Sequence, residues 1–228
     1  MVLDSTYHFL SNLYLIMKTI TLYTLCIIAL ILQSCGDSTA PTSDDIQTIK
    51  IGTQVWTSKN LDVSTYRNGD PIRYSSTPAE WLDAAHKGEG AWCYYNNDPK
   101  NGAKYGKLYN WYAVKDPRVL APIGYHISSD AELSVLTEYL GGEEIAGYKM
   151  KSTSGWSNGA NGDNSSGFNG LPGGACNSDG DFYRITASGY FWSSSETWYR
   201  ELRNDFDTKV YRGSYDKRYG FSVRCLRD

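Results

Sequence analysis

The sequence lacks the residue patterns that identify most hydrolases, phosphate-binding enzymes and thiol-based metal sites. It contains no HExxH, no GxSxG and no glycine motif that could cradle a phosphate. Three histidines are present, and none stands in an order that indicates a catalytic triad. Five cysteines occur without a CxxC or CxxH spacing, which argues against a zinc site. We therefore expect no enzymatic activity, and predict that His126 hydrogen-bonds near a helix start.

Basic charge and long apolar segments are scarce as well. The net charge is -3, with 22 Lys and Arg against 25 Asp and Glu, so no positively charged field for nucleic acid exists. The apolar run from Ile20 to Leu32 is shorter than the roughly 20 residues that a membrane-spanning helix needs. These scarcities argue against a nucleic-acid partner and against a transmembrane helix.

The short apolar run is instead typical of a lipoprotein export signal. Met17 and Lys18 form a basic start before it, and LQSC ends it at Cys35. We expect residues 1–34 to comprise upstream residues and a signal peptide, with the true start at Met17. Cys35 is predicted to carry the lipid, and residues 35–45 to form a flexible tether. An ordinary secretory signal with a chance cysteine, or a buried apolar helix, are the alternatives.

This interpretation places the protein at the cell envelope, attached to the outer membrane by its lipid and facing the periplasm or the cell surface. The remaining residues 46–228 are enough for one folded domain. Their aromatic composition is unusual, because 19 Tyr and 7 Trp stand against 6 Phe in the chain. Such amphipathic rings suit both binding surfaces and half-buried sheets.

Local signals predict strands at both ends and helices between them. Gly52 and Thr53 lie between two short apolar segments and predict a hairpin. Thr77, Pro78 and Glu80 predict the start of a short helix that ends at Gly88.

A second helix is predicted to begin after Ser129 and to stop at Gly141, with an extension over 143–151. Leu133, Val135, Leu136 and Leu140 are predicted to form its apolar face. From Gly155 onward, short alternating segments rich in Gly, Ser and aromatic residues predict antiparallel strands. This order of elements indicates an α+β fold.

Three cysteines remain once the leader and the lipid site are set aside. Cys93, Cys176 and Cys225 would all reach an oxidising compartment. One disulfide and one free thiol are the simplest outcome, and the sequence alone leaves all three pairings open.

Five motifs between residues 94 and 228 carry a family resemblance. They are YYNNDPKNGAKYGKLYNWYAV (94–114), GYHISSDAEL (124–133), GFNGLPGG (167–174), GYFWSSSE (189–196) and YGFSVRCLRD (219–228). In this order they resemble the Fibrobacter succinogenes major paralogous domain, a family of exported proteins and lipoproteins found largely in Bacteroidetes and Fibrobacteres. The resemblance covers residues 49–228.

The resemblance implies a C-type lectin-like fold, distantly similar to the formylglycine-generating domains. Two main helices would pack on antiparallel sheets, the N- and C-terminal strands would pair, and long irregular loops would present ligands. Family members often carry a cysteine before the proline where this chain has Ala121 and Pro122. A bridge from that point to Cys225 is therefore in doubt, and Cys93, or less expectedly Cys176, could pair with Cys225 instead.

Aromatic and arginine side chains near turns in the last third are candidates for ligand binding. Flat amphipathic rings can stack on sugars or dock a protein partner, although half-buried sheet packing accounts for each ring equally well. Trp192, inside GYFWSSS, is instead predicted to lie in the core. The candidate residues are Trp198, Tyr199, Tyr211, Arg212 and Tyr215.

Oxygen-bearing side chains gather in two glycine-rich loops and suggest a calcium site. Asp163 and Asn164 lie in the first loop, and Asp179 and Asp181 lie in the second. Calcium takes six to eight oxygen ligands, so these four residues are the predicted metal ligands. The alternative is that Asn, Asp and Gly simply form turns.

Taken together, these observations predict a lipid-anchored, non-catalytic binding protein whose ligand is a glycan or a surface protein. One alternative is an oxidative enzyme of the formylglycine-generating type, which would need Cys176 or Cys225 exposed and reactive. Another is a structural subunit of a surface assembly.

Overall fold

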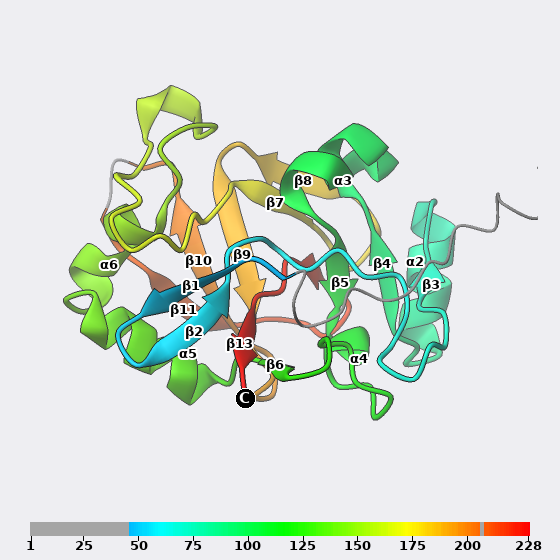
Figure 1. Ribbon diagram of the computed structural model, residues 1–228. Helices are drawn as coiled ribbons and strands as arrows, with labels where there is room; N and C mark the ends of the chain where they lie inside the picture. Colours follow the sequence, from blue (N-terminus) through cyan, green and yellow to red (C-terminus); the bar gives the residue numbers. More distant parts are fainter. Residues whose placement is uncertain (1–45, 206–207) are drawn as a thin grey trace, which may run out of the picture. The chain divides into compact units, whose positions relative to one another are not determined.

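The computed structural model describes residues 46–205 and 208–228 (Figure 1). Two β-sheets and several helices make up this part of the chain, which confirms the α+β class. The predicted leader, the lipidated Cys35 and the tether over 35–45 all lie outside the described residues. No helix among the residues described is both long enough and apolar enough to cross a membrane.

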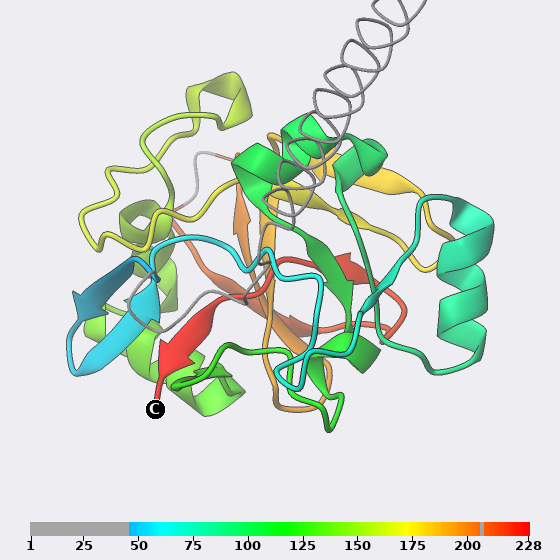
Figure 2. The same ribbon diagram turned by 45° about the vertical axis from the view of Figure 1, so that its right-hand side comes forward.

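The smaller sheet joins the beginning of the described chain to its end. The predicted hairpin is confirmed as β1 (Thr48–Ile51) and β2 (Gln54–Thr57), with Gly52 in the left-handed region at φ 61°. β2 pairs antiparallel with β13 (Cys225–Arg227), and β13 pairs in turn with β6 (Tyr125–Ile127). Figure 2 shows the red C-terminal strand beside the cyan strand of the hairpin.

The larger sheet has nine strands: eight follow one another in the order β11-β10-β9-β7-β12-β5-β4-β3, and β8 pairs with β7 off that path. Most neighbours are antiparallel, as predicted, but β3 pairs with β4 and β7 pairs with β9 in parallel. The bounds are β3 Arg73–Tyr74, β4 Ala91–Cys93, β5 Leu108–Asn110, β7 Gly173–Cys176, β8 Phe182–Ile185, β9 Ser188–Trp192, β10 Trp198–Arg203, β11 Tyr211–Ser214 and β12 Gly220–Phe221.

Capping boxes start the two helices that the sequence predicts. Thr77 and Glu80 cap α2 (Pro78–His86), and Ser129 and Glu132 cap α5 (Asp130–Tyr139). The predicted extension is a separate helix, α6 (Glu143–Met150), because Gly142 takes a φ of 93° between the two. Shorter helices lie between α2 and α5 and after α6. They are η2 Tyr95–Asn97, α3 Pro99–Tyr105, α4 Trp111–Val114 and η3 Ser157–Gly159.

The predicted apolar face of α5 needs one correction. Leu133, Leu136 and Leu140 are buried, but Val135 is 48% exposed. Leucines spaced by three and four residues share one face, whereas Val135 lies about 100° around the helix from Leu136.

Buried side chains form three clusters. One contains Trp56 together with the buried leucines of α5, and a second is centred on Trp192 and Phe221. Trp192 has no exposed surface, so its predicted core position is confirmed. The third cluster lies against α2 and contains Cys93 and Cys176.

Candidate functional site: a circle of five tyrosines

Five tyrosine rings close a circle on one face of the larger sheet. Each contacts the next at a centroid distance between 4.3 and 6.3 Å, so that the last ring returns to the first. The rings come from β8, β9 and β10 and from the segment between β11 and β12. We call this set the tyrosine circle: Tyr183, Tyr190, Tyr199, Tyr215 and Tyr219.

Phe221 packs against the tyrosine circle from its buried side. This residue has no exposed surface and lies 4.8 Å from the Tyr190 ring, nearly parallel to it. Tyr199, Tyr215 and Tyr219 also contact Phe221, at 5.4 to 6.0 Å. Edge and offset contacts between aromatic rings favour particular ring orientations, in addition to the stabilisation that comes from burying apolar surface. The circle is therefore held from below by a rigid aromatic core.

One half of the circle is buried and the other half reaches the surface. Tyr190 and Tyr199 are 5% and 9% exposed, whereas Tyr215 is 39% exposed. Tyr183 and Tyr219 are half-buried. The accessible part is thus the side formed by Tyr183, Tyr215 and Tyr219.

Strand register explains why these side chains share a face. Tyr190 lies opposite Glu201, and Trp192 lies opposite Tyr199, across the β9–β10 pair. Directly opposed residues of an antiparallel pair point to the same side of the sheet. Gly213 faces Tyr199 on β11, and a Cβ atom there would lie 2.8 Å from the tyrosine ring. The close approach of β11 to the circle therefore requires glycine.

A buried carboxylate lies beneath the hydroxyl groups. Glu201 is 2% exposed; it accepts a hydrogen bond from Ser188 Oγ at 3.0 Å and pairs with Arg203 Nη2 at 2.8 Å. Burial, and next the charge of Glu201, raise the pKa of Tyr199. The Tyr199 hydroxyl therefore stays protonated and can donate a hydrogen bond at neutral pH.

Tyr183 has the least satisfied polar group of the circle. Burial raises the pKa of Tyr183 strongly, with further contributions from Tyr190, Tyr215 and Tyr219. Its hydroxyl is buried and has no hydrogen-bond partner among residues 46–205 and 208–228. A buried hydroxyl without a partner costs about 1–3 kcal/mol. A ligand could reach this oxygen only if a neighbouring side chain moved aside.

The five predicted ligand-binding residues are divided between two faces. Tyr199 and Tyr215 belong to the circle, and Tyr211 lies opposite Glu201 on the same face, with the Arg203 guanidinium 3.7 Å from its ring. Trp198 and Arg212 lie on the other face. The structure therefore does not bring all five candidates together on one face.

Trp198 and Arg212 instead belong to an ion-pair cluster beside α5. The Arg212 guanidinium lies 3.8 Å from the Trp198 ring and binds Asp130 Oδ2 at 2.7 Å. Asp130 also binds Arg200 Nη1 at 2.6 Å, and Arg200 is 1% exposed. Burial alone would raise the pKa of Asp130, but hydrogen bonds from Arg212 and Arg200 outweigh it and lower the pKa.

The sequence analysis missed Tyr183, Tyr190 and Tyr219. The separation of Trp198 from Tyr199 could have been predicted, because consecutive residues of a strand point to opposite faces and Trp198 directly precedes Tyr199. No comparable local signal places Tyr183 or Tyr219 beside Tyr199.

The predicted calcium ligands do not meet. The loop of Asp163 and Asn164 packs on α6, where Asp163 N bonds to Tyr148 O. The loop of Asp179 and Asp181 packs on α2, with Gly180 against Pro78. Figure 1 shows α6 and α2 on opposite sides. Within the described parts of the chain, no three His, Cys, Asp or Glu side chains form a group that could hold a metal.

These loop oxygens stabilise turns. Asp163 Oδ1 accepts hydrogen bonds from both N and Oγ of Ser165, each at 2.9 Å. Asn177 Oδ1 accepts the N–H groups of Asp179 and Asp181 at 2.9 and 2.8 Å. Asn and Asp side chains often form such local turns.

The three candidate cysteines are buried free thiols, with at most 1% exposure. Cys93 and Cys176 share the cluster beside α2, whereas Cys225 lies in the Trp192 cluster. The structure therefore places Cys93 and Cys176 in one cluster and Cys225 in another, which does not support the expected pairing of Cys225 with either of them. Burial raises the pKa of Cys225 to about 12. An exposed, reactive Cys176 or Cys225, which the oxidative-enzyme alternative requires, is not what the structure contains.

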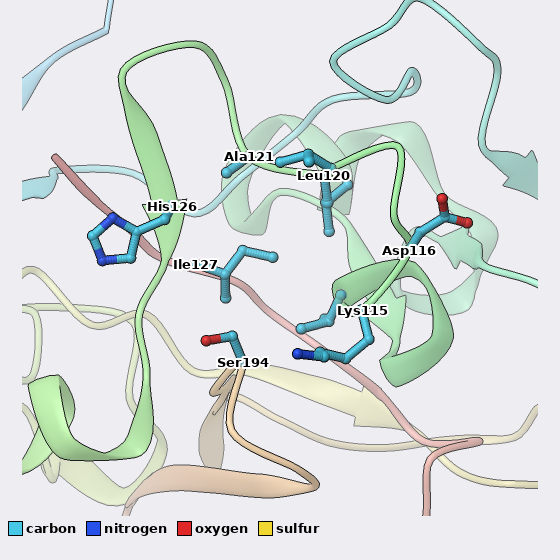
Figure 3. A pocket seen from close by; sticks show the side chains of 9 residues that line it. Lys115, Asp116, Leu120, Ala121, His126, Ile127 and Ser194 are labelled. Carbon is cyan, nitrogen blue, oxygen red and sulfur yellow. The ribbon is translucent and has the colours of Figure 1, made fainter. Parts of the chain in front are cut away.

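A cavity of about 250 Å³ lies beside His126 (Figure 3). His126 Nδ1 lies 2.7 Å from Asp228 Oδ1, and His126 Nε2 lies 3.0 Å from Glu132 Oε1. Glu132 is in the first turn of α5, so the predicted hydrogen bond of His126 near a helix start is confirmed. Figure 3 shows Lys115 and Asp116 on the opposite side of the cavity from the His126 ring.

Most of the charged side chains beside this cavity are paired with other charged side chains. Burial alone would lower the pKa of His126, but hydrogen bonds from Asp228 and Glu132 outweigh it and raise the pKa. Asp116 is bound by Arg118 Nη2 at 2.8 Å. We therefore place the candidate site at the tyrosine circle rather than here.

Comparisons with known proteins agree with the motifs of the sequence. A family model described as the Fibrobacter succinogenes major domain matches residues 49–227. Neither the search of curated proteins nor the search of solved structures found a match. The matched residues comprise nearly all of the described chain, including the whole tyrosine circle. The chain therefore belongs to the Fibrobacter succinogenes major domain family.

Proposed function

We propose that this protein is a non-catalytic, lipid-anchored binding protein of the cell envelope, and that it recognises a glycan through the tyrosine circle. The observation that carries the glycan assignment is a closed set of five tyrosines with one accessible side and an unpartnered Tyr183 hydroxyl. The signal pattern ending at Cys35 supports the anchor.

The chemistry of the accessible side suits a sugar. The apolar C–H face of a hexose can stack on a tyrosine ring, and its hydroxyl groups can bond to phenol oxygens. Tyr215 offers the most exposed ring, and Tyr183 offers a buried hydroxyl. Rings fixed by Phe221 lose little conformational entropy on binding.

The finer fold assignment is part of the same proposal. We infer a C-type lectin-like fold from the pairing of β2 with β13 and from the long segment over 152–172, whose one regular element is η3. Because fold does not determine function, the glycan assignment depends on the tyrosine circle and not on this likeness.

A glycan array probed with the labelled full chain tests the ligand. The wild type is expected to bind, Tyr215→Ala to weaken binding at least tenfold, and Tyr183→Phe to weaken it while leaving the fold intact. Tyr139→Ala is the matched control, because Tyr139 is a 65% exposed tyrosine on α5, away from the circle. No bound glycan, or equal losses in the Tyr215 and Tyr139 variants, would contradict the proposal.

Fractionation of cells tests the anchor separately. The wild type is expected in the membrane fraction, and Cys35→Ser is expected to move it to the soluble fraction. Mass spectrometry should find the Cys35 peptide with acyl chains. An unmodified Cys35 in mature wild-type protein would refute lipid anchoring without affecting the glycan site.

A further inference from the structure

Cys93 and Cys176 meet although they come from strands that are not neighbours. Cys93 ends β4, and Cys176 ends β7, with β12 and β5 between these strands in the sheet order. The chain after β4 closes the gap, because Tyr95 packs on β7: a Cβ atom on Gly174 would lie 2.7 Å from its ring. Both cysteines belong to one buried cluster.

The surrounding packing holds the two side chains against each other. After burial, the neighbouring Cys176 is the main cause that raises the pKa of Cys93, which agrees with their place in one buried cluster. Trp81 covers this cluster from α2, and a Cβ atom on Gly220 would lie 2.9 Å from its ring and 3.1 Å from Cys176 Cβ. The space around the two sulfur atoms is therefore filled, and neither thiol has another cysteine within its cluster.

We infer that Cys93 and Cys176 form the disulfide of the exported protein, and that Cys225 is its free thiol. This inference goes beyond the proposed glycan binding and depends only on the export that accompanies it. Cys225 lies in the separate Trp192 cluster, where its charged neighbours are Arg224, Arg67 and Asp228.

The bond forms by thiol–disulfide exchange with a disulfide of an envelope thiol oxidoreductase. One cysteine, as its thiolate, attacks the donor disulfide and forms a mixed disulfide; the second cysteine then displaces the donor. The Cys93–Cys176 bond forms, the donor disulfide breaks, two protons leave the cysteines, and the donor receives two electrons as a dithiol. Burial strongly disfavours the thiolate of Cys93 in the folded chain. Oxidation therefore takes place while the chain folds.

The bridge would fasten β4 to β7 across the middle of the larger sheet. It closes a loop of roughly 80 residues, for which the loss of unfolded-state entropy is large. We expect the reduced protein to melt about 10 °C lower than the oxidised protein. Because both cysteines are buried and neither belongs to the tyrosine circle, glycan binding at low temperature should change little on reduction.

Peptide mapping of the full chain tests the pairing in two settings. The first sample is isolated from the envelope of an expressing bacterium, trapped with N-ethylmaleimide and digested without reduction. The second is refolded from denaturant with oxidised and reduced glutathione. Both should give one linked peptide pair containing Cys93 and Cys176, with Cys225 alkylated. Cys225→Ser is the matched control and should keep the linked pair, whereas Cys93→Ser should leave Cys176 alkylated.

The outcomes separate this inference from the proposed function. A bond from Cys225 to either partner, or three alkylated thiols after glutathione refolding, would overturn the pairing. A pair that forms with glutathione but not in cells would support the pairing and refute export to an oxidising compartment. Loss of glycan binding in wild-type protein with the bond intact would refute only the glycan proposal.

Discussion

Replacing Arg224 by methionine is predicted to destabilise the domain severely. Arg224 lies on the C-terminal segment and is 1% exposed, without a carboxylate partner among the ion pairs of the described chain. Burial lowers the pKa of Arg224 to about 9, so its guanidinium still carries a charge at pH 7. The charge is balanced by hydrogen bonds to four oxygen atoms from two separate segments, residues 57–60 and 168–169.

These bonds set the size of the expected loss. Arg224 Nε donates to Asn60 Oδ1 at 2.7 Å, Nη1 to the carbonyl oxygens of Thr57 and Phe168 at 2.8 Å each, and Nη2 to Asn169 O at 3.1 Å. Each buried acceptor left unpaired costs about 1–3 kcal/mol, while removing the buried charge returns part of that cost. We expect a net loss of about 4 kcal/mol, a large share of the 5–15 kcal/mol typical of domains.

Urea unfolding of the full chain, followed by tryptophan fluorescence, measures this loss. With an m-value of about 2 kcal/mol/M, the midpoint should fall by about 2 M. Arg227→Met is the control three residues further along, at the end of β13, because Arg227 is exposed; its loss should stay below about 1 kcal/mol. Asn60→Ala should couple to Arg224→Met by more than about 1 kcal/mol. A loss below 1 kcal/mol for Arg224→Met would refute the argument that this network joins the ends of the domain.

Two further predictions concern other buried contacts. Asp130→Asn should cost about 2–3 kcal/mol at neutral pH, because Arg200 loses its buried anionic partner and Arg212 its surface one. The pKa of Asp130 is lowered in the folded state, so its contribution is complete above pH ~4 and disappears as the pH falls further; urea midpoints from pH 7 to pH 3 should show the two proteins converging. Gly147→Ala, a change that usually favours a helix by about 1 kcal/mol, should instead destabilise the domain. The new Cβ would lie 2.0 Å from Lys209 O, and a rise in the melting temperature would contradict that contact.

Local features could be predicted from the sequence because their information lies within a few residues. The capping boxes of α2 and α5 each need a hydroxyl side chain and a glutamate three positions later, so each signal lies within four consecutive residues. The hairpin depends on Gly52, which takes a left-handed φ at the turn. The α+β class follows from the order of such elements.

The tyrosine circle could not be predicted in the same way, because its rings come from four segments. Their contacts depend on which strands pair, and alternation within one strand contains no information about its partner. The position of β12 between β7 and β5 brings Phe221 and Tyr219 to the site, although β7 and β5 lie far earlier in the sequence. Knowledge of which strands pair was therefore needed before the five tyrosines could be grouped as one candidate site.

The use of tyrosine rather than phenylalanine in the circle supports the proposal that the rings bind a ligand. If the rings served only to fill the core, phenylalanine at Tyr183 would give the same ring contacts with Tyr190 and Tyr219 and would remove an unpartnered buried hydroxyl. Removing that group should stabilise the fold by about 1 kcal/mol or more. A polar atom retained at such a cost, beside the exposed ring of Tyr215, is accounted for when a ligand supplies the missing hydrogen bond. If the proposed glycan binding is right, the same hydroxyl would lower stability in the free protein and increase affinity in the complex.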